Sequence, residues 1–460
     1  MNRSTQIALL VAATFFMENL DATVIVTALP EMARSFGVQP VDLGIGMSCY
    51  LLAMAAFIPL SGWAADRFGA RTTFTVAIAA FSLSSLLCGL SQSLEMFVAA
   101  RVLQGVSGAL MVPVGRLAVL RATEKKDLVR TLGYITVPGL VAPVLGPPVG
   151  ALLVTHASWP WIFYLNVPVG IVALIVASRL LDNHRAGSRG AFDWLGFVWV
   201  SGSCVLLLSA FEMLGHASTQ GWVAALVLLS AVLLGAIGVR HLRLVTEPLV
   251  KLAVLGIPTF RLTFFSGSLF RVCISTLPFL LPLMFQLAFG FSAIAAGSLM
   301  IAVFAGNLVM KVFTTEILKR WGFRRVLLIN GWLGVLCIAG CALLDRSSSQ
   351  HLVLLLLFLG GLSRSLQFTA YNNVGFSEIP AADMRDASTL FSMAFQLSMG
   401  LGIAIGALLL RAAMLTHGSA GIPSAQDFQF AFVCVSVLAA VAIWDSRRMR
   451  RDAGALVLQG

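Results

Sequence analysis

The chain has 460 residues, of which 58% are hydrophobic and 11% are charged, and its mean hydropathy is +0.92. A soluble protein carries about a quarter charged residues, so the composition excludes a soluble protein and predicts one that crosses a membrane many times. The formal net charge of +11 could suggest a nucleic-acid partner. The basic residues, however, form short clusters between apolar segments, which is typical of cytoplasmic loops, and we expect no nucleic-acid partner.

Fourteen apolar segments separated by polar loops are candidates for membrane-spanning helices, each of which needs about 20 residues. They are expected at 6–30, 44–64, 72–91, 95–118, 131–154, 159–181, 194–213, 222–243, 262–287, 292–315, 325–344, 351–376, 386–411 and 428–445. Polar connectors divide them into six, two and six. We therefore expect an N-terminal six-helix bundle at 1–181, a two-helix insert with its connectors at 182–250, and a C-terminal six-helix bundle at 251–460.

The basic residues predict the topology. With the loops assigned alternately to the two sides of the membrane, one side receives 23 Lys and Arg residues and the other receives three. The remaining five of the 31 lie within the apolar segments. Because basic loops stay in the cytoplasm, this bias predicts an even number of helices, with both termini cytoplasmic.

The first segment contains two carboxylates, Glu18 and Asp21, within its apolar run. An ionisable group near the middle of a spanning helix costs several kcal/mol unless it has a partner or a watery cavity. Residues three apart share one face of a helix, so we interpret the pair as a proton or cation site. The alternative is that both side chains only hydrogen-bond to neighbouring helices.

The chain also contains an internal repeat. Asp66-Arg67-Phe68-Gly69-Ala70-Arg71, after the second segment, matches Lys319-Arg320-Trp321-Gly322-Phe323-Arg324, after the second segment of the last six. Two six-helix halves that arose by duplication are typical of a large class of secondary transporters.

Four motifs in the first half carry a family resemblance. They are Leu20–Pro30, Gly62–Arg71, Arg101–Leu110 and Gly139–Gly150. With them, the chain resembles the major facilitator superfamily and, within it, the 14-helix drug:proton antiporters. The resemblance implies an all-α membrane fold of two six-helix bundles plus a two-helix insert, in the bacterial cytoplasmic (inner) membrane.

The same resemblance implies a function. The expected activity is the export of a lipophilic or amphipathic small molecule in exchange for protons, by alternating access within the lipid bilayer. The proton gradient then supplies the energy, and neither a cofactor nor a metal is expected. The seven Cys residues agree with this expectation, because they show no metal-ligand or redox spacing.

The resemblance also implies a proton-coupling set. Asp21 stands at the family's proposed protonation site, Glu18 lies beside it, and the helix rise places Arg101 at a similar depth. A buried Arg beside a carboxylate would help to expel its proton. A purely structural ion pair between Arg101 and Asp21 is the alternative.

Two of the motifs are interpreted as parts of the gate. Glycines allow tight turns and close helix approach, prolines bend a helix, and Asp66 can pair with a cation or a helix N-terminus to close the cytoplasmic side. The candidate gating residues are Gly62, Asp66, Arg67, Gly69, Arg71, Gly139, Gly146, Pro147 and Gly150.

The second half contributes two cations deep within apolar segments, Arg271 and Arg364. We interpret them as cavity residues that act as counter-ions for the carboxylates or as anchors for an acidic or zwitterionic substrate group. With Asn372 and Gln104 they make up the candidate substrate-cavity set.

Two other functions stay open. A metabolite or lysolipid transporter without proton coupling is favoured by Arg271 and Arg364, because a pump for cationic drugs gains little from buried Arg. A membrane-bound enzyme or sensor lacks support, since the sequence has no metal-ligand cluster, no nucleophile–base motif and no long soluble domain.

Overall fold

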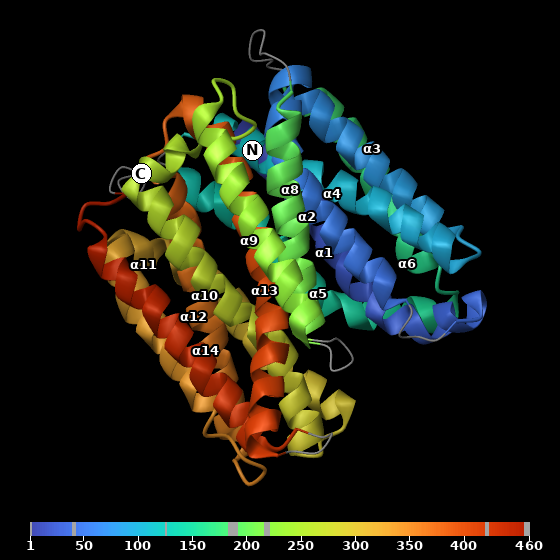
Figure 1. The fold of residues 1–460 in the computed structure, drawn as a ribbon, viewed down its shortest axis with the longest axis vertical. Coiled ribbons are helices and arrows are strands. Elements are labelled where there is room, and N and C mark those ends of the chain that lie inside the picture. The colour runs from blue at the N-terminus through green and yellow to red at the C-terminus, as the bar shows by residue number, and fades with distance from the viewer. Residues whose placement is uncertain are drawn as a thin grey trace.

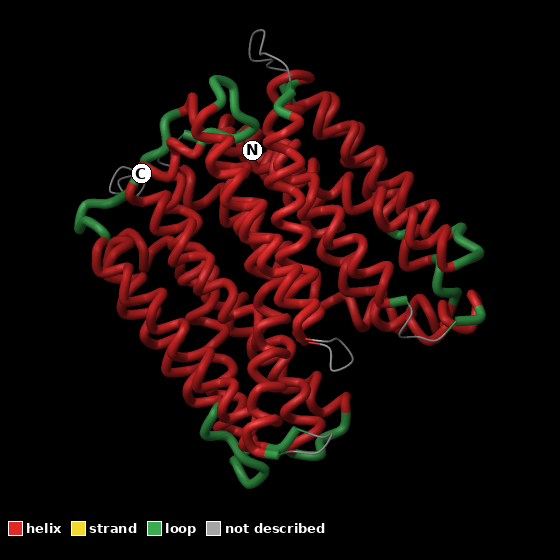
Figure 2. The backbone as a smooth tube through the Cα atoms, in the orientation of Figure 1, coloured by secondary structure: helices red, strands yellow, loops and turns green. Residues whose placement is uncertain are grey.

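The computed structural model describes residues 2–38, 43–124, 127–182, 192–215, 221–418 and 423–454. Within these ranges the chain is built of helices and connecting loops, without β-strands (Figure 2). Each segment expected to cross the membrane lies on a helix or, for 159–181 and 262–287, on two consecutive helices.

The helices fall into three consecutive groups along the chain. The first group is α1 (Arg3–Phe36), α2 (Gly44–Phe68), α3 (Ala70–Gly89), α4 (Leu94–Ala122), α5 (Leu128–His156), α6 (Trp161–Tyr164) and α7 (Asn166–Leu180). The second is α8 (Trp194–Gly215) and α9 (Gly221–Leu244). The third is α10 (Pro258–Leu283), α11 (Ala293–Cys341), α12 (Gln350–Ser377), α13 (Met384–His417) and α14 (Ala425–Asp445), with the short helices η2 (Leu252–Gly256), η3 (Met284–Ala288), η4 (Ala381–Asp383) and η5 (Ser446–Arg448).

Twelve helical segments of the described residues are long and apolar enough to cross a membrane. One of them, Ala295–Cys341, has 47 residues and covers most of two expected segments, 292–315 and 325–344. It consists of two helices that meet at Gly322, where φ is 73° and ψ is 160°. This merger accounts for one of the two segments by which twelve falls short of the fourteen expected, and the other is 131–154, which lies on α5 and is not among the twelve.

The internal repeat has a structural counterpart. Gly69, between α2 and α3, has φ 91° and ψ 146°, close to the angles of Gly322 within α11. Both values lie in a region that glycine enters at little cost and other residues avoid. The two matched motifs therefore make the same backbone turn, as expected of two halves that share an origin.

The first and third groups each form a bundle. In the first, α1 packs against α5 and α4 against both α2 and α3, and in the third, α10 packs against α13 and α11 against α12. Helices α8 and α9 pack on each other, and α8 also contacts α2 of the first bundle and α13 of the second. Ser201 Oγ of α8 donates to the carbonyl of Ala56 at 2.5 Å, and Arg411 Nη1 of α13 donates to the carbonyl of Leu214 at 2.9 Å. The α8–α9 pair thus bridges the two bundles.

The two bundles are not parallel. Their ribbons lie close together at the end that carries both termini and diverge toward the opposite end (Figure 1). We call the closed end the terminal end, where α1 begins at Arg3 and α14 ends at Asp445. The contacts between the bundles run from α2 and α4 to α13 and from α5 to α11 and α12.

Candidate functional site

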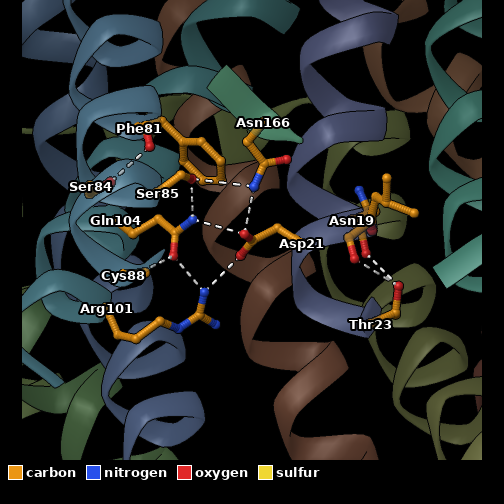
Figure 3. A network of polar contacts seen from close by, with 11 residues as sticks. Asn19, Asp21, Thr23, Phe81, Ser84, Ser85, Cys88, Arg101, Gln104 and Asn166 are labelled. Atoms are coloured by element: carbon orange, nitrogen blue, oxygen red, sulfur yellow. Dashed lines mark hydrogen bonds and ion pairs between the residues drawn. The ribbon is translucent and has the colours of Figure 1, made fainter. Parts of the chain in front are cut away.

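Asp21 of α1 lies at the centre of a buried polar network (Figure 3). Its Oδ2 is 2.7 Å from Arg101 Nη1, and its Oδ1 accepts hydrogen bonds from Gln104 Nε2 at 3.0 Å and Asn166 Nδ2 at 2.7 Å. Asp21 is 3% exposed and Arg101 is 1% exposed. The carboxylate therefore has a charged partner and two neutral donors, which compensate the cost of burying it.

A second layer of contacts holds this network in place. Ser85 Oγ of α3 accepts from Gln104 Nε2 at 2.8 Å and from Asn166 Nδ2 at 3.3 Å. Gln104 Oε1 in turn accepts from Arg101 Nη1 at 2.5 Å. The network thus joins four helices of the first bundle, α1, α3, α4 and α7, around one carboxylate.

Glu18 lies almost one turn before Asp21 on α1 but in a different environment. It is 8% exposed, its Oε2 is buried without a hydrogen-bond partner, and no ion pair among the described residues includes it. Gly108 of α4 lies beside it, since a Cβ built there would be in van der Waals contact with Oε2, at 3.6 Å. Burial without a partner makes an ionised carboxylate costly, whereas a neutral carboxylic acid costs much less.

Tyr50 of α2 completes the surroundings of the two carboxyl groups. Its ring centre lies 4.2 Å from the guanidinium carbon of Arg101, and its hydroxyl is buried with no hydrogen-bond partner among the residues that the structure describes. The structure thus brings Glu18, Asp21 and Arg101 together, as the proton-coupling hypothesis requires. It also separates the two carboxyls chemically, because one is ion-paired and the other is not.

Asp66, at the end of α2, connects the two bundles at the terminal end. Its Oδ2 is 2.9 Å from Arg385 Nη1 of α13, and its Oδ1 is 3.4 Å from Arg121 Nη2 of α4. Arg385 also contacts Asp386. Asp66 and Arg385 are 2% and 3% exposed, so the contact between the bundles is a buried ion pair.

Asp66 belongs to the motif Gly62–Arg71, whose glycines shape the contact between α2 and α13. A Cβ at Gly62 would lie 2.7 Å from Thr389 Oγ1, so the glycine allows α2 to approach α13 closely. Gly69 supplies the turn with positive φ into α3. Arg67 and Arg71 are exposed at the terminal end, and a gating role for them stays a prediction.

Helices α1 and α5 pack closely through glycines of the motif Gly139–Gly150. A Cβ at Gly146 would lie 2.2 Å from Thr23 Oγ1, and one at Gly150 would lie 2.2 Å from Thr27 Oγ1 and 2.9 Å from the carbonyl oxygen of Val24. For Gly139 and Pro147, the other candidates on this helix, the surroundings lie outside the described residues.

We predict that Gly150→Ala destabilises the protein. Alanine raises helix propensity, but the new methyl group would overlap the α1 backbone at Val24, and overpacking of this kind costs about 1–3 kcal/mol. A Cβ at Gly133, on the same helix, would have no described atom within 4 Å, so Gly133→Ala is the matched control. Thermal unfolding of the purified proteins checks the prediction, which fails if both variants are equally stable.

The candidate substrate-cavity residues do not form one cluster. Gln104 belongs to the Asp21 network, and Asn372 is buried on α12, 8% exposed. Arg364 lines a pocket between α10, α11 and α12 whose other side chains, such as Leu277 and Cys337, are apolar or small. Arg271 is 4% exposed and contacts aromatic rings of the second bundle.

One cation that the sequence interpretation did not single out is Arg116 of α4. It is 7% exposed, and its guanidinium carbon lies 4.4 Å from the ring centre of Phe391 on α13. It lies six residues past the end of the motif Arg101–Leu110. Its charge could have identified it as a candidate from the sequence, because it is one of only five cations within the apolar segments. Asn166 and Ser85 were missed in the same way, as polar residues in apolar surroundings.

A comparison with protein families decides the classification. The family model described as Major Facilitator Superfamily matches residues 11–403. The chain belongs to this superfamily. Probable transport protein HsrA of Haemophilus influenzae is 32% identical over 449 residues, which cover 97% of this chain and 96% of that protein. Putative multidrug resistance protein MdtD of Salmonella heidelberg is 35% identical over 439 residues, which cover 94% and 92%.

Solved structures show the same fold. The human organic anion transporter MFSD10 has a TM-score of 0.66 at 16% identity, covering 96% of this chain and 99% of that one. The proton:xylose symporter XylE has a TM-score of 0.67 at 14% identity, covering 99% and 98%. The predicted family and the major facilitator fold are confirmed. The protein is therefore a multi-pass membrane transporter of the major facilitator superfamily.

Proposed function

We propose that this transporter is a proton-coupled antiporter that exports lipophilic or amphipathic small molecules across the bacterial cytoplasmic membrane, with both termini in the cytoplasm. The name of the MdtD relative supports a role in multidrug efflux. The observation that carries proton coupling is the inequality of the two carboxyls on α1. Asp21 is ion-paired to Arg101, whereas Glu18 is buried with an unpartnered oxygen.

The two carboxyls can divide the work of proton transfer. The Arg101 guanidinium stabilises a negative charge on Asp21, and the buried Glu18 carboxyl, which has no ionic partner among the described residues, would be the group that binds the transported proton. Loss of that proton would place two negative charges on one face of α1. Movement of α1 against α2 and α4 would then expose Glu18 to water, so that protonation follows the conformational state.

Alternating access supplies that movement. The bundles at 1–181 and 251–460 would rock against each other, with the insert at 182–250 as a brace on the seam between them. The buried Asp66–Arg385 pair closes the terminal end in the described state. With the termini cytoplasmic, this state faces outward, and opening of the cytoplasmic side requires Asp66 to part from Arg385.

Glu18→Gln tests the assignment in everted membrane vesicles. We first identify a transported compound with a panel of cationic, neutral and anionic amphipaths. The variant mimics a permanently protonated carboxyl, so uptake driven by a pH gradient should fall by about tenfold or more, a typical size for coupling between two ligands. Gradient-free exchange of the same compound should persist.

The matched control is Glu212→Gln. Glu212 is an exposed carboxylate of α8 that accepts a hydrogen bond from Ser48 Oγ at 2.8 Å, and we expect its replacement to leave coupled transport unchanged. Gradient-driven uptake by the Glu18 variant at the rate of the unmodified protein would refute the proposal.

A transporter of anionic metabolites or lysolipids without proton coupling is the second candidate. The observation in its favour is Arg271, which is buried and whose two terminal nitrogens have no hydrogen-bond partner in the described ranges. Proton release on addition of substrate to purified protein separates the two functions, since only an antiporter releases protons when its cargo binds.

A further inference from the structure

Two buried guanidinium groups, one from each bundle, contact the same aromatic ring. The guanidinium carbon of Arg116 on α4 lies 4.4 Å from the ring centre of Phe391, and that of Arg271 on α10 lies 4.7 Å from it. The exposed fractions are 7% and 4%. Because both guanidinium groups contact the same ring, the two positive charges are close enough to repel each other. Contact with an aromatic face stabilises each cation but leaves its hydrogen-bonding groups free.

Several of these hydrogen-bonding groups have no partner within the described part of the chain. Nη1 of Arg116 and both Nη1 and Nη2 of Arg271 are buried there without a hydrogen bond. Buried guanidinium groups normally pair with carboxylates, because an unpaired buried charge is strongly unfavourable. The two Arg residues therefore present donors to an acceptor that the described residues do not supply.

Two acidic residues on helices that pack against α10 already have partners. Asp386, five residues before Phe391 on α13, contacts Arg385, which also pairs with Asp66. Asp445, at the end of α14, accepts a hydrogen bond from Ser266 Oγ at 2.6 Å and lies 3.4 Å from Arg448. No ion pair among the described residues includes Arg116 or Arg271, so two positive charges are left between the bundles.

We propose that Arg116 and Arg271 form the binding site for an anionic head group, such as a carboxylate, on the transported molecule. Guanidinium groups bind carboxylates in planar, bidentate geometry. The rings of Phe368 and Phe395 lie 5.9 Å and 5.8 Å from the Arg271 guanidinium carbon and supply an apolar surface for the body of the molecule. The inference rests on the proposed export function and narrows its cargo to anionic amphipaths.

The position of the site couples it to the gate. Phe391 follows Arg385 by six residues on α13, about 9 Å along the helix. Between them, Ser388 Oγ donates to the carbonyl of Pro113 on α4 at 3.2 Å. Arg116 moves with the first bundle and Arg271 with the second. Parting of the bundles at the terminal end would therefore separate the two cations, so the site exists intact in only one state of the cycle.

Binding to purified protein in lipid nanodiscs tests the site without a proton gradient. The probes are 4-phenylbutyrate, 4-phenylbutan-1-ol and 4-phenylbutylamine, which share one body and differ in the charge of the head. We expect the carboxylate to bind at least about tenfold more tightly than the alcohol, and the amine to bind no better than the alcohol, because like charges repel. If the unmodified protein binds all three probes with equal affinity, or binds the amine most tightly, the proposal is refuted, and no variant is needed to show it.

Variants locate the binding. Arg116→Gln and Arg271→Gln should each weaken 4-phenylbutyrate binding by about 30-fold or more, as expected when one partner of a buried charge pair is removed. Arg447→Gln is the matched control, because the Arg447 guanidinium carbon also lies over an aromatic ring, 3.6 Å from the ring centre of Trp444, but the residue is exposed, and this variant should bind like the unmodified protein. Carboxylate binding that survives both Arg variants would place the anion elsewhere and refute the assignment.

The result of these binding experiments does not depend on whether transport is coupled to protons. Selective, Arg-dependent binding with no effect of Glu18→Gln on transport would support the anion site and reject the antiport mechanism. Loss of coupling in Glu18→Gln, with no head-group preference in binding, would do the reverse. If a Gln variant is recovered unfolded, Arg116→Lys and Arg271→Lys keep the charge but lose the bidentate geometry, and we expect weaker but measurable carboxylate binding.

Discussion

Replacing Asp21 with Asn is expected to abolish pH-gradient-driven transport in everted vesicles. The substitution removes one of the two carboxyls on α1 and leaves the guanidinium of Arg101, 1% exposed, without its negative partner. An uncompensated buried charge typically destabilises a protein by about 3–5 kcal/mol. We therefore expect both a loss of coupled transport and a lower melting temperature of the purified variant.

A double variant separates these two effects. Asp21→Asn combined with Arg101→Gln removes the uncompensated charge and should recover most of the lost stability, since a neutral pair can still hydrogen-bond to Gln104. Coupled transport should stay absent if Asp21 takes part in proton exchange. Recovery of gradient-driven transport in the double variant would show that the ion pair between Asp21 and Arg101 is only structural.

Asp66→Asn is expected to open the terminal end. The substitution removes the charge that pairs with Arg385 across the two bundles and with Arg121 within the first. Truncating one partner of a buried charge pair costs about 2–5 kcal/mol, and only the closed state contains this contact between bundles. The equilibrium should therefore shift toward the state that is open at the terminal end, with coupled transport reduced by about tenfold or more.

Pulsed EPR distances between spin labels at positions 68 and 321 measure this shift. Both positions are exposed, one in each of the matched motifs of the two bundles. The labels require replacement of Cys49 and Cys434 by Ser, since the other native Cys residues are buried. We expect a longer distance for Asp66→Asn than for the unmodified protein.

Arg179→Gln provides the control for the gate experiment. Arg179 is an exposed cation in the last turn of α7, outside the candidate gating set, so its replacement should change neither the distance distribution nor transport. If Asp66→Asn leaves the population of the closed state unchanged, the Asp66–Arg385 ion pair does not keep the terminal end closed.

The sequence by itself determined the architecture. Apolar segments of spanning length, punctuated by basic loops, have few solutions in a membrane, because every backbone polar group must be satisfied within a helix. The repeat at Gly69 and Gly322 already indicated duplication, since both positions require the same turn. The charged residues in the first segment, Glu18 and Asp21, were visible as candidates because a bilayer tolerates few such side chains.

The tertiary structure decided which of these residues meet. Asp66 pairs with Arg385, 319 residues away, and Arg116 and Arg271 share one ring although they belong to different bundles. It also made Glu18 and Asp21 unequal, although their spacing placed them on one face. The physical reason is that a helix surrounded by lipid and other helices is apolar on nearly every side. Its sequence shows which side chains need partners, but its rotation, and hence the partner of each, depends on packing against the whole bundle.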